Sequence, residues 1–437
     1  MAKKLWGGRF KKKVNKEFFR FQKSISYDYK LANYDILHSR IHIVALKNAK
    51  ILTPGDAKKM DTALKQILKG IRNKTFKPNL ASEDIHTDVQ NRVEKKCGKL
   101  ALKLQTFRSR NDQIVFCEKG YCDDESGNIA DLLGEVISSL EFLAVKYKGF
   151  HFVGYTHTQR AEKIAFMSYI AAFESMFTRD KERLLEFRKK LTLYIGSGAF
   201  KGSSLIKNYD RAIKEFLKKT FEKALSGKIK AVENPPDNVS DRDFIIEFLS
   251  ILSIVQMHLS RLAEDFILFS TNEFNYMELP EDFCTGSSLM PHKKNPDFME
   301  LIRGYTGRIY GNLASILTTM KGLPLTYNRD MQLDKEPLFS SVEIIKDELA
   351  VLADFIKGIR LNRNAIVESL KDESLYATAL AEYLVKKKIP FGTAHEIVGK
   401  LIRYSEDNKC KIRQMGNETL KRFSHCLNKK VVDQIFE

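Results

Sequence analysis

Residues 286–296 read Gly-Ser-Ser-Leu-Met-Pro-His-Lys-Lys-Asn-Pro and gather several groups that can do chemistry. Glycine and proline on either side of Ser287 and its neighbouring serine predict an irregular, bendable loop. Lys293 follows, and Asn295 before Pro296 predicts an N-cap and a first helical residue. Hydroxyls, fixed cations and the positive end of a helix suit an anionic small molecule. A polar loop without chemistry is the alternative for Gly-Ser-Ser alone.

Three other segments carry polar side chains that do not fit a solvated helix face. They are 82–87 (Ser-Glu-Asp-Ile-His-Thr), 108–113 (Arg-Ser-Arg-Asn-Asp-Gln) and 154–160 (Gly-Tyr-Thr-His-Thr-Gln-Arg). Each has an ordinary structural explanation as well. The acids of the first favour a helix N-terminus, the second can be a solvated turn, and His157 can be a hydrogen-bonded structural histidine. Together they mark candidate site segments.

Long helices must position these segments. No proline occurs between Pro78 and Pro235, and the sequence between them is dense in Leu, Lys, Glu and Ala. Apolar residues at steps of three or four run from Leu133 to Tyr147, and others follow a Ser-Asp-Arg-Asp capping box at 240–243. A third helix is expected from Pro296 to Met320, where Lys-Gly-Leu-Pro stops it.

These patterns predict an all-α fold. Several helices are expected to exceed 20 residues, and their wide apolar faces favour packing in a bundle and association of several chains. Breaks are expected near 78–84, 195–208, 233–240 and 358–364.

Composition limits the function classes. The chain has 437 residues and 73 Lys+Arg against 55 Asp+Glu, a net charge of +18. This excess is spread along the sequence and no nucleic-acid-binding motif accompanies it, so a lysine-rich surface is favoured over nucleic-acid binding. The six cysteines form no Cys-x-x-Cys pair, so neither a metal site nor a disulfide framework is predicted. No signal peptide or membrane span is expected, and the cytoplasm is the expected compartment.

The polar segments together resemble the fumarase/aspartase superfamily and, within it, the argininosuccinate lyases. The resemblance covers nearly the whole chain. The segments that carry it are 4–10 (Lys-Leu-Trp-Gly-Gly-Arg-Phe), 83–87, 108–113, 154–160, 196–199, 240–244, 286–296, 322–328 and 383–396. The serine loop is typical of the superfamily. The Leu-Trp-Gly-Gly-Arg-Phe opening and the Arg-Ser-Arg-Asn-Asp-Gln run favour argininosuccinate lyase.

The resemblance implies a three-domain fold with a long central helical bundle shared in a homotetramer. The expected domains are an N-terminal helical domain (1–106), a central long-helix domain with the lid loop 284–296 (107–360) and a small C-terminal helical domain with a shortened tail (361–437). Each active site is expected to take residues from three subunits. The implied reaction splits argininosuccinate into arginine and fumarate without a cofactor or a metal.

The same resemblance implies roles for catalytic residues. Ser287 is expected to act as the base, as an alkoxide favoured by nearby cations and backbone N–H groups. Lys293 and Asn295 would hold the negative charge that develops on the substrate carboxylate. His157 would give the leaving nitrogen its proton, and Glu300 would fix the tautomer of His157.

Further residues are expected to bind the substrate, which carries both carboxylates and cationic groups. Asp28 and Asp84 suit its cationic end, whereas Asn111 and Lys335 suit its carboxylates. The full expected set is Ser24, Asp28, Asp84, His86, Ser109, Arg110, Asn111, Thr156, Asn295, Tyr327, Gln332 and Lys335. The loop at 286–296 is expected to close over the substrate as a lid.

The sequence departs from the family pattern at several positions. Gln105 and Phe107 stand where histidine and glycine are usual, and His292 stands where glutamine is usual in the lid. If the usual glycine serves a positive φ, then Phe107 is strained or has reshaped the pocket. None of the departures removes a proposed catalytic group.

Three rival hypotheses stay open. The first is another lyase of the superfamily, such as an adenylosuccinate lyase, which shares the serine loop. The second is a catalytically silent structural relative, comparable to the lens crystallins of this family. The third is a basic nucleic-acid-binding scaffold, which has only the net charge in its favour.

Overall fold

The computed structural model describes residues 11–12, 14–220 and 227–436. The described chain is predominantly helical, which confirms the predicted all-α class. Its α-helices are α1 (Lys16–Phe21), α2 (Ile25–Asp28), α3 (Ala32–Asn48), α4 (Pro54–Arg72), α5 (Ile85–Cys97), α6 (Arg110–Lys146), α7 (Phe166–Lys190), α8 (Tyr209–Lys219), α9 (Pro235–Ser240), α10 (Asp243–Ser270), α11 (Asp297–Met320), α12 (Lys335–Gly358), α13 (Arg363–Ser369), α14 (Ala377–Lys386), α15 (Phe391–Asp407), α16 (Asn417–Phe423) and α17 (Lys429–Phe436).

Short strands and 3-10 turns join these helices. The strands form four two-stranded ladders: β1 (His151–Thr156) with β2 (Gln159–Ala165), β3 (Leu193–Ile195) with β4 (Ile229–Ala231), β5 (Met277–Glu278) with β8 (Arg360–Leu361), and β6 (Thr285–Gly286) with β7 (Lys294–Asn295). Among the described residues, only the β3–β4 pair is parallel. The 3-10 helices used below are η2 (Gly98–Gln105), η5 (Arg329–Asp334) and η6 (Glu373–Tyr376).

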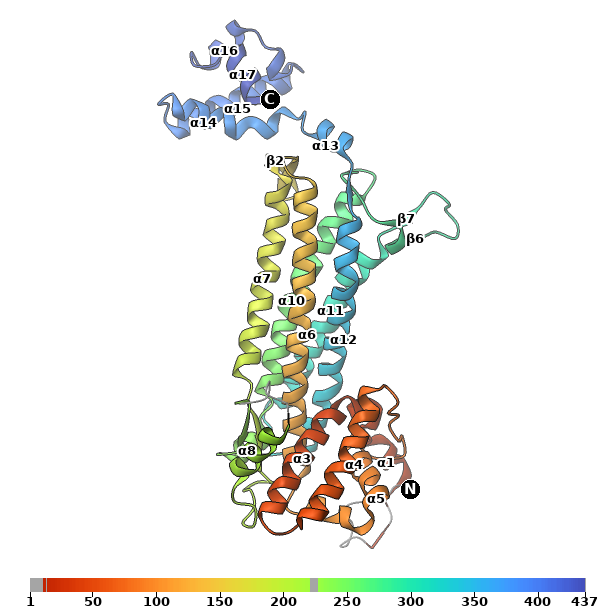
Figure 1. Ribbon diagram of the computed structural model, residues 1–437. Helices are drawn as coiled ribbons and strands as arrows, with labels where there is room; N and C mark the ends of the chain where they lie inside the picture. The colour runs from red at the N-terminus through yellow and green to blue at the C-terminus, as the bar shows by residue number, and fades with distance from the viewer. Residues whose placement is uncertain (1–10, 13, 221–226, 437) are drawn as a thin grey trace. The chain divides into compact units, whose positions relative to one another are not determined.

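The chain packs into two compact units. Unit 1 comprises residues 1–133, 179–257 and 304–349, and unit 2 comprises 134–178, 258–303 and 350–437. Five long helices, α6, α7, α10, α11 and α12, each contribute a part to both units (Figure 1). The three domains expected from the sequence divide the chain differently and stay a prediction.

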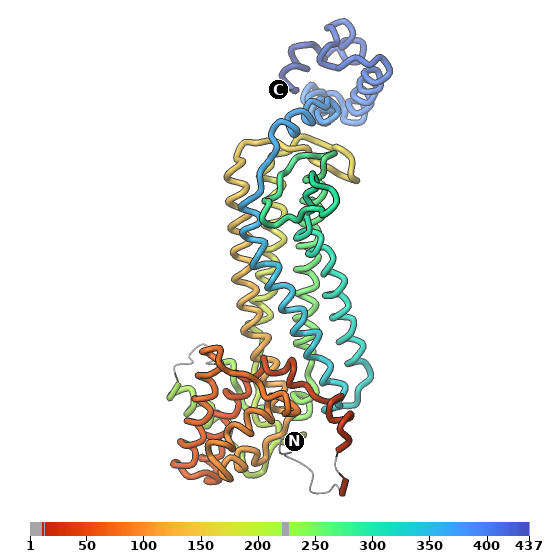
Figure 2. The backbone as a smooth tube through the Cα atoms, turned by 90° about the vertical axis from the view of Figure 1, so that its right-hand side faces the viewer, coloured from red at the N-terminus to blue at the C-terminus, as the bar shows by residue number. Residues whose placement is uncertain are grey.

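In unit 1, helices α3, α4 and α5 pack against one another beside the N-terminal part of α6 (Figures 1 and 2). Helix α4 has a capping box in which Thr53 and Asp56 bond each other's backbone N–H groups, with Pro54 at the first helical position. This satisfies amide groups that a helix start leaves without partners. The N-terminal region of unit 1 is thereby a stable support for the site residues on α5 and α6.

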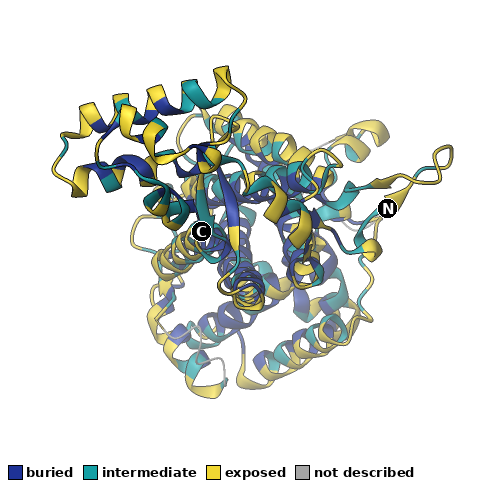
Figure 3. Cartoon of the chain, turned by 90° about the horizontal axis from the view of Figure 1, so that it is seen from above, coloured by how far each residue is buried: buried dark blue, intermediate teal, exposed yellow. Residues whose placement is uncertain are grey.

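The predicted apolar stripes are the buried faces of the long helices. Leu133, Val136, Leu140 and Leu143 are buried on α6, and Phe248, Leu252, Val255 and Leu259 are buried on α10. Figure 3 shows dark blue buried faces and yellow exposed faces along the helices. Among the described residues, α10 alone is long and apolar enough for a membrane span, but 61% of its most apolar window is buried, as in a core helix.

The predicted start of the helix after residue 240 is wrong. Ser240 does not open a helix, because it is the last residue of α9 and its Oγ donates to the Pro236 carbonyl. Helix α10 begins at Asp243, whose N–H bonds the Asp241 carboxylate instead. The expected break at 233–240 therefore contains the short helix α9, which two prolines start after Asn234. The predicted end of α11 is confirmed by Gly322 at φ 68°.

Candidate active site

The serine loop is closed at its base by a two-residue ladder in unit 2. Strands β6 and β7 pair Thr285 with Asn295 and Gly286 with Lys294, so the irregular segment runs over 287–293. An ion pair between Lys294 and Glu281 and a hydrogen bond from Thr285 Oγ to Asp297 brace the same base. The loop extends away from the helices of its unit (Figure 1). It is a projecting segment on a fixed base.

The oxygen of Ser287 accepts two backbone hydrogen bonds within the loop. The donors are the N–H groups of Met290, at 3.0 Å, and of Leu289, at 3.3 Å. Backbone N–H groups aimed at an oxygen stabilise negative charge there without any reorganisation. The loop therefore carries its own support for an ionised serine, which is the form that a base requires.

Ladder pairing corrects the predicted start of the following helix. Asn295 is not an N-cap, since its extended backbone belongs to β7, and α11 begins at Asp297. The carbonyl of Pro296 accepts the first helical bond, from Glu300 N at 3.0 Å. The positive end of α11 still faces the loop, one residue later than predicted.

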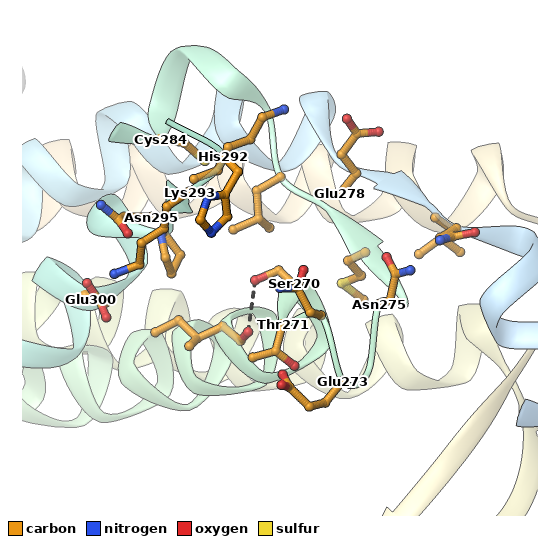
Figure 4. Close-up of a pocket in the computed structure, with 18 of the residues that line it drawn as sticks. Ser270, Thr271, Glu273, Asn275, Glu278, Cys284, His292, Lys293, Asn295 and Glu300 are labelled. Atoms are coloured by element: carbon orange, nitrogen blue, oxygen red, sulfur yellow. Dashed lines mark hydrogen bonds between the residues drawn. The ribbon is translucent and has the colours of Figure 1, made fainter. Parts of the chain in front are cut away.

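A cavity of about 1040 Å³ in unit 2 lies beside the loop (Figure 4). Lys293, Asn295 and Glu300 line it, together with His292 and the acids Glu273 and Glu278. Cations, an amide and carboxylates thus face one space, which suits a ligand that bears both charges. The structure brings three predicted site residues together here.

His157 occupies a tight turn. Thr156 pairs with Gln159 in the β1–β2 ladder, so His157 and Thr158 form a two-residue hairpin turn with φ values of 54° and 58°. Such turns favour Asn and Gly, and a β-branched residue with positive φ is an outlier. The sequence patterns did not predict this hairpin. Strained backbone of this kind persists where the surroundings enforce it, often at functional sites.

Side-chain contacts on both strands hold the hairpin in this conformation. The hydroxyls of Tyr155 and Tyr276 share a hydrogen bond of 2.8 Å, and Arg160 pairs with Asp372 at 3.1 Å. Burial raises the pKa of Tyr155, and the Tyr276 hydroxyl adds to the shift, so the phenol stays neutral. The turn that presents His157 is therefore fixed from both strands.

Among the described residues, no hydrogen bond or ion pair joins His157 to Glu300. His157 is exposed at its turn, and Glu300 lines the cavity. The predicted partnership of these two residues stays a prediction.

A second set of predicted residues forms a hydrogen-bonded group in unit 1. Asp28 accepts from Ser24 Oγ at 2.6 Å and from the N–H of Ile85 at 3.0 Å. Burial, and then the nearby Asp84, raise the pKa of Asp28 to about 6. Both oxygens already have protein donors, so the structure gives Asp28 a structural role. Its contact with substrate stays a prediction.

Asp84 and His86 are also engaged. Asp84 caps α5 through the N–H of Thr87 and pairs with Arg110 at 3.2 Å. His86 Nδ1 bonds Asp35 at 2.8 Å. Burial opposes ionisation of Asp35, but His86 prevails and holds the pKa of that carboxyl well below its usual range. Asp35 fixes the ring of His86.

The polar run at 108–113 turns out to be mostly structural. Arg108 donates to Ser39, Gln113 donates to Asp35 at 2.7 Å, and Ser109 Oγ accepts from the N–H of Asn111 at 3.2 Å. Asp112 accepts from the N–H groups of Gly196 and Ser197, both at 3.1 Å. Among the described residues, the Asn111 side chain makes no hydrogen bond, which leaves it available to a ligand.

Phe107 has φ 54°, a backbone conformation that favours glycine, so the condition for strain at this position is met. Its side chain is 52% exposed. Such a conformation costs a bulky residue about 1–2 kcal/mol. Phe107 is thus strained rather than packed, directly before the Arg108–Gln113 run.

Tyr327, Gln332 and Lys335 lie on η5 and its neighbours. Gln332 Nε2 donates to the carbonyl of Gln22 at 2.9 Å, which ties η5 to the segment before Ser24. Burial raises the pKa of Tyr327, against the opposing effect of Lys335. Lys335 is buried and its ammonium lies 2.7 Å from both Glu118 and Asp334. Sequence patterns missed Glu118, Asp334 and Asp35, because isolated acids on helices resemble surface residues until their partners are known.

One group of possible metal ligands is present in the described residues. Asp35, His86 and Cys117 place ligand atoms within 4.8 Å of one another, all buried. Burial raises the pKa of the Cys117 thiol, whereas metals bind the thiolate. The chemistry therefore favours the Asp35–His86 hydrogen bond over a metal centre.

Of the sixteen predicted site residues, unit 1 holds Ser24, Asp28, Asp84, His86, Ser109, Arg110, Asn111, Tyr327, Gln332 and Lys335, and unit 2 holds Thr156, His157, Ser287, Lys293, Asn295 and Glu300. The motif at 4–10 lies outside the described residues.

Comparison with known proteins defines the class first. A family model described as "Lyase" matches residues 8–311, and one described as "Argininosuccinate lyase C-terminal" matches 374–437. A class II fumarase from Schistosoma mansoni has the same fold, with a TM-score of 0.79 at 18% identity over 94% of this chain and 91% of that one. An EDDS lyase variant with bound fumarate gives 0.78 at 20% identity over 98% and 84%. The protein is a lyase of the fumarase/aspartase superfamily.

Curated relatives narrow the class. The argininosuccinate lyase of Caldanaerobacter subterraneus subsp. tengcongensis is 43% identical over 99% of this chain and 96% of its own. That of Hydrogenobaculum sp. is 40% identical over 99% and 92%, and that of Ruthia magnifica 41% identical over 99% and 88%. The chain belongs to the argininosuccinate lyase family.

Proposed function

We propose that this protein catalyses the reversible β-elimination of argininosuccinate to L-arginine and fumarate in arginine biosynthesis. The observation that carries the proposal is the Ser287 oxygen with two backbone donors, in a chain 43% identical to a curated argininosuccinate lyase. An elimination of this type needs a base, a holder for the developing carboxylate charge and a proton for the leaving nitrogen.

Ser287, as an alkoxide, would take the proton from the carbon beside a substrate carboxylate. The electron pair left on carbon delocalises into that carboxylate, and Lys293 and Asn295 stabilise the resulting dianion. The C–N bond then breaks as the C=C bond of fumarate forms. His157 protonates the departing guanidino nitrogen. The substrate therefore loses one proton from carbon and gains one on nitrogen.

The residues of unit 1 are proposed to bind the substrate's ends. The Asn111 amide and Lys335 suit its carboxylates, and Asp28, Asp84 and His86 form the polar wall nearby. The substrate is a small molecule, and its three carboxylates and two cationic groups require this mixture of charges. The proposed compartment is the cytoplasm. No cofactor, nucleic acid or membrane takes part in the proposed reaction.

A homotetramer that completes each site with residues of several chains is also part of the proposal. Helix α11 supports it, because its surface carries four exposed large apolar side chains, Leu301, Tyr305, Tyr310 and Leu317. Gly304, Gly307 and Gly311 lie on the same helix, and a Cβ added at any of them would meet nothing within 4 Å. Glycine lowers the stability of an exposed helix by about 1 kcal/mol relative to alanine, and close packing of another backbone can offset this loss. The glycines of α11 therefore favour close approach of another chain to this helix.

The test is a fumarate assay with purified protein and argininosuccinate, followed by ultraviolet absorbance. The unaltered protein is expected to form fumarate and Ser287→Ala to abolish it. Ser288→Ala is the matched control, since it removes the adjacent hydroxyl and should leave turnover largely intact. No fumarate from the assembled, unaltered protein overturns the proposal. Fumarate from adenylosuccinate instead supports the rival lyase, and neither activity supports the silent relative.

A further inference from the structure

Four charged side chains form a closed cluster in the interior of unit 1. Glu118 comes from α6, Arg242 immediately precedes α10, Asp334 ends η5 and Lys335 begins α12. All four are buried. Arg242 pairs with Asp334 and lies 3.3 Å from Glu118, while Lys335 lies 2.7 Å from both carboxylates. Two acids and two bases thus balance, which makes their burial tolerable.

The position of Lys335 is unusual for a lysine. It is the first residue of α12, where the helix dipole opposes a cation, and it is nearly inaccessible to water. An ammonium has three N–H donors. Asp334 accepts one of them, and Glu118 forms an ion pair with the ammonium at 2.7 Å, so a donor remains for a further acceptor. The cluster therefore both compensates the unfavourable location and limits the direction in which Lys335 can act.

Lys335 also lies within electrostatic range of the predicted substrate-binding residues. Its charge lowers the pKa of Asp28 and of Tyr327, in each case against a larger opposing effect of burial. The charge of Lys335 also lowers the pKa of Tyr27, against the larger raising effect of burial. Lys335 is thus close enough to Asp28 and Tyr327 to act on a ligand that binds beside them.

We infer that Glu118 is a positioning residue: together with Asp334 it fixes the Lys335 ammonium so that its third N–H meets a carboxylate of the substrate. Arg242 holds the two acids in place. This inference rests on the proposed function for the identity of the substrate. It assigns a role to Glu118 and Asp334, which no motif singled out for chemistry.

The electrostatics of the cluster agree with its geometry. Burial lowers the pKa of Lys335, but Asp334 and Glu118 outweigh it and raise the net value, so the ammonium is permanent. Burial and the neighbouring Asp334 raise the pKa of Glu118. Loss of the Lys335 charge would thus leave Glu118 without its main compensation, which couples the two residues.

Glu118→Gln is the primary test, with fumarate binding by calorimetry and the kinetics of argininosuccinate cleavage as readouts. We expect the Kd of fumarate and the KM of argininosuccinate to rise about tenfold, or about 1.4 kcal/mol, with kcat changed far less. Glu118→Asp keeps the charge but withdraws the carboxylate from Lys335. It should reproduce the loss of affinity in a protein that folds normally.

Asp123→Asn is the matched control, because Asp123 is also a buried, ion-paired acid of α6, with Lys228 and Arg188 as its partners. It should lose comparable stability without any change in Kd or KM. A double-mutant cycle adds the decisive comparison. In a Lys335→Met background, Glu118→Gln should weaken fumarate binding no further, since the residue through which it acts is gone.

Three results would overturn the inference. The first is an equal effect of Glu118→Gln and Asp123→Asn on both stability and Kd. The second is a full, additive effect of Glu118→Gln in the Lys335→Met background. The third is absence of fumarate binding by the unaltered protein. Failure of the proposed function is a separate outcome, seen as fumarate binding with an intact Glu118 effect but no cleavage of argininosuccinate.

Discussion

The backbone N–H of Met290 donates a hydrogen bond of 3.0 Å to the Ser287 oxygen, three residues earlier in the same loop. The support for an ionised serine is therefore part of the loop itself and moves with it.

A substitution that removes this donor should slow turnover. Met290→Pro deletes the N–H, and loss of one oxyanion donor typically costs about a hundredfold in kcat. Met290→Ala keeps the N–H and serves as the control for loss of the side chain. Both variants should unfold at nearly the same temperature, because Met290 is exposed. Equal kcat values for the two variants would show that the Met290 donor is dispensable.

Phe107→Gly should stabilise the protein. Glycine relieves about 1–2 kcal/mol of strain at φ 54° but adds up to about 1 kcal/mol of unfolded-state entropy, which leaves a small net gain. Phe107→Ala removes the same ring and keeps the strain, so it should show no gain. Thermal melts of the two variants decide the matter. If Phe107 also impairs the pocket, turnover of Phe107→Gly rises as well.

Asp28→Asn should change the pH dependence of stability. The folded pKa of about 6 lies above the usual 3.8, because burial and Asp84 disfavour the charged form. The folded state therefore binds the proton more tightly, and the stability this contributes is present below about pH 4 and lost as pH rises through 6. At pH 8 the amide should gain on the order of 1–3 kcal/mol, with little gain at pH 4.

Urea unfolding at both pH values measures this difference. Asp131→Asn is the control, because it makes the same chemical change at an exposed position of α6. A gain for Asp28→Asn that is the same at pH 4 and pH 8 would contradict the assigned protonation. Activity should fall in spite of the added stability, since Asp28 is proposed to lie beside the substrate.

The run at 108–113 should separate into structural and functional residues. Asp112→Asn replaces one oxygen acceptor by a donor facing the N–H groups of Gly196 and Ser197, so it should cost about 1–3 kcal/mol of stability. Asn111→Ala removes a side chain that has no hydrogen-bond partner among the described residues. It should lose activity at nearly unchanged melting temperature, and a large drop in that temperature would show a structural role.

A charge on α11 should disrupt the proposed tetramer. Leu317 is 49% exposed in the chain, and Leu317→Glu would bury a carboxylate in an interface between copies. Light scattering should then report a smaller mass than that of four chains. Leu102→Glu, at a 46% exposed leucine of η2, is the control and should leave the mass unchanged.

The long helices were predictable because their signals are local. The apolar stripe from Leu133 to Tyr147 repeats at helical spacing, and Gly322 marks the end of α11. Boundaries that depend on distant partners were not. Asn295 resembles an N-cap in isolation, and only its ladder partner Thr285, ten positions earlier, makes it a strand residue.

The site was predictable as a set of motifs rather than as a set of roles. Ser287 and its loop were identified from residue types, but the donors at Leu289 and Met290 depend on the fold of the loop. The polar run at 108–113 looked uniform in sequence. Its division into structural residues and a free Asn111 depends on Ser39, Asp35 and Gly196, which come from other parts of the chain.

The hairpin of β1 and β2 contains one extra residue, Ala161, since Gly154 pairs with Glu162 but Tyr155 pairs with Arg160. Without that irregularity, Tyr155 would face Ala161, Thr156 would face Arg160, and the turn would hold three residues instead of two. The backbone conformation of His157 is thus decided by a residue count in the opposite strand. A change in that residue count would alter the turn that presents His157, although every residue of the proposed machinery would still be present in the sequence.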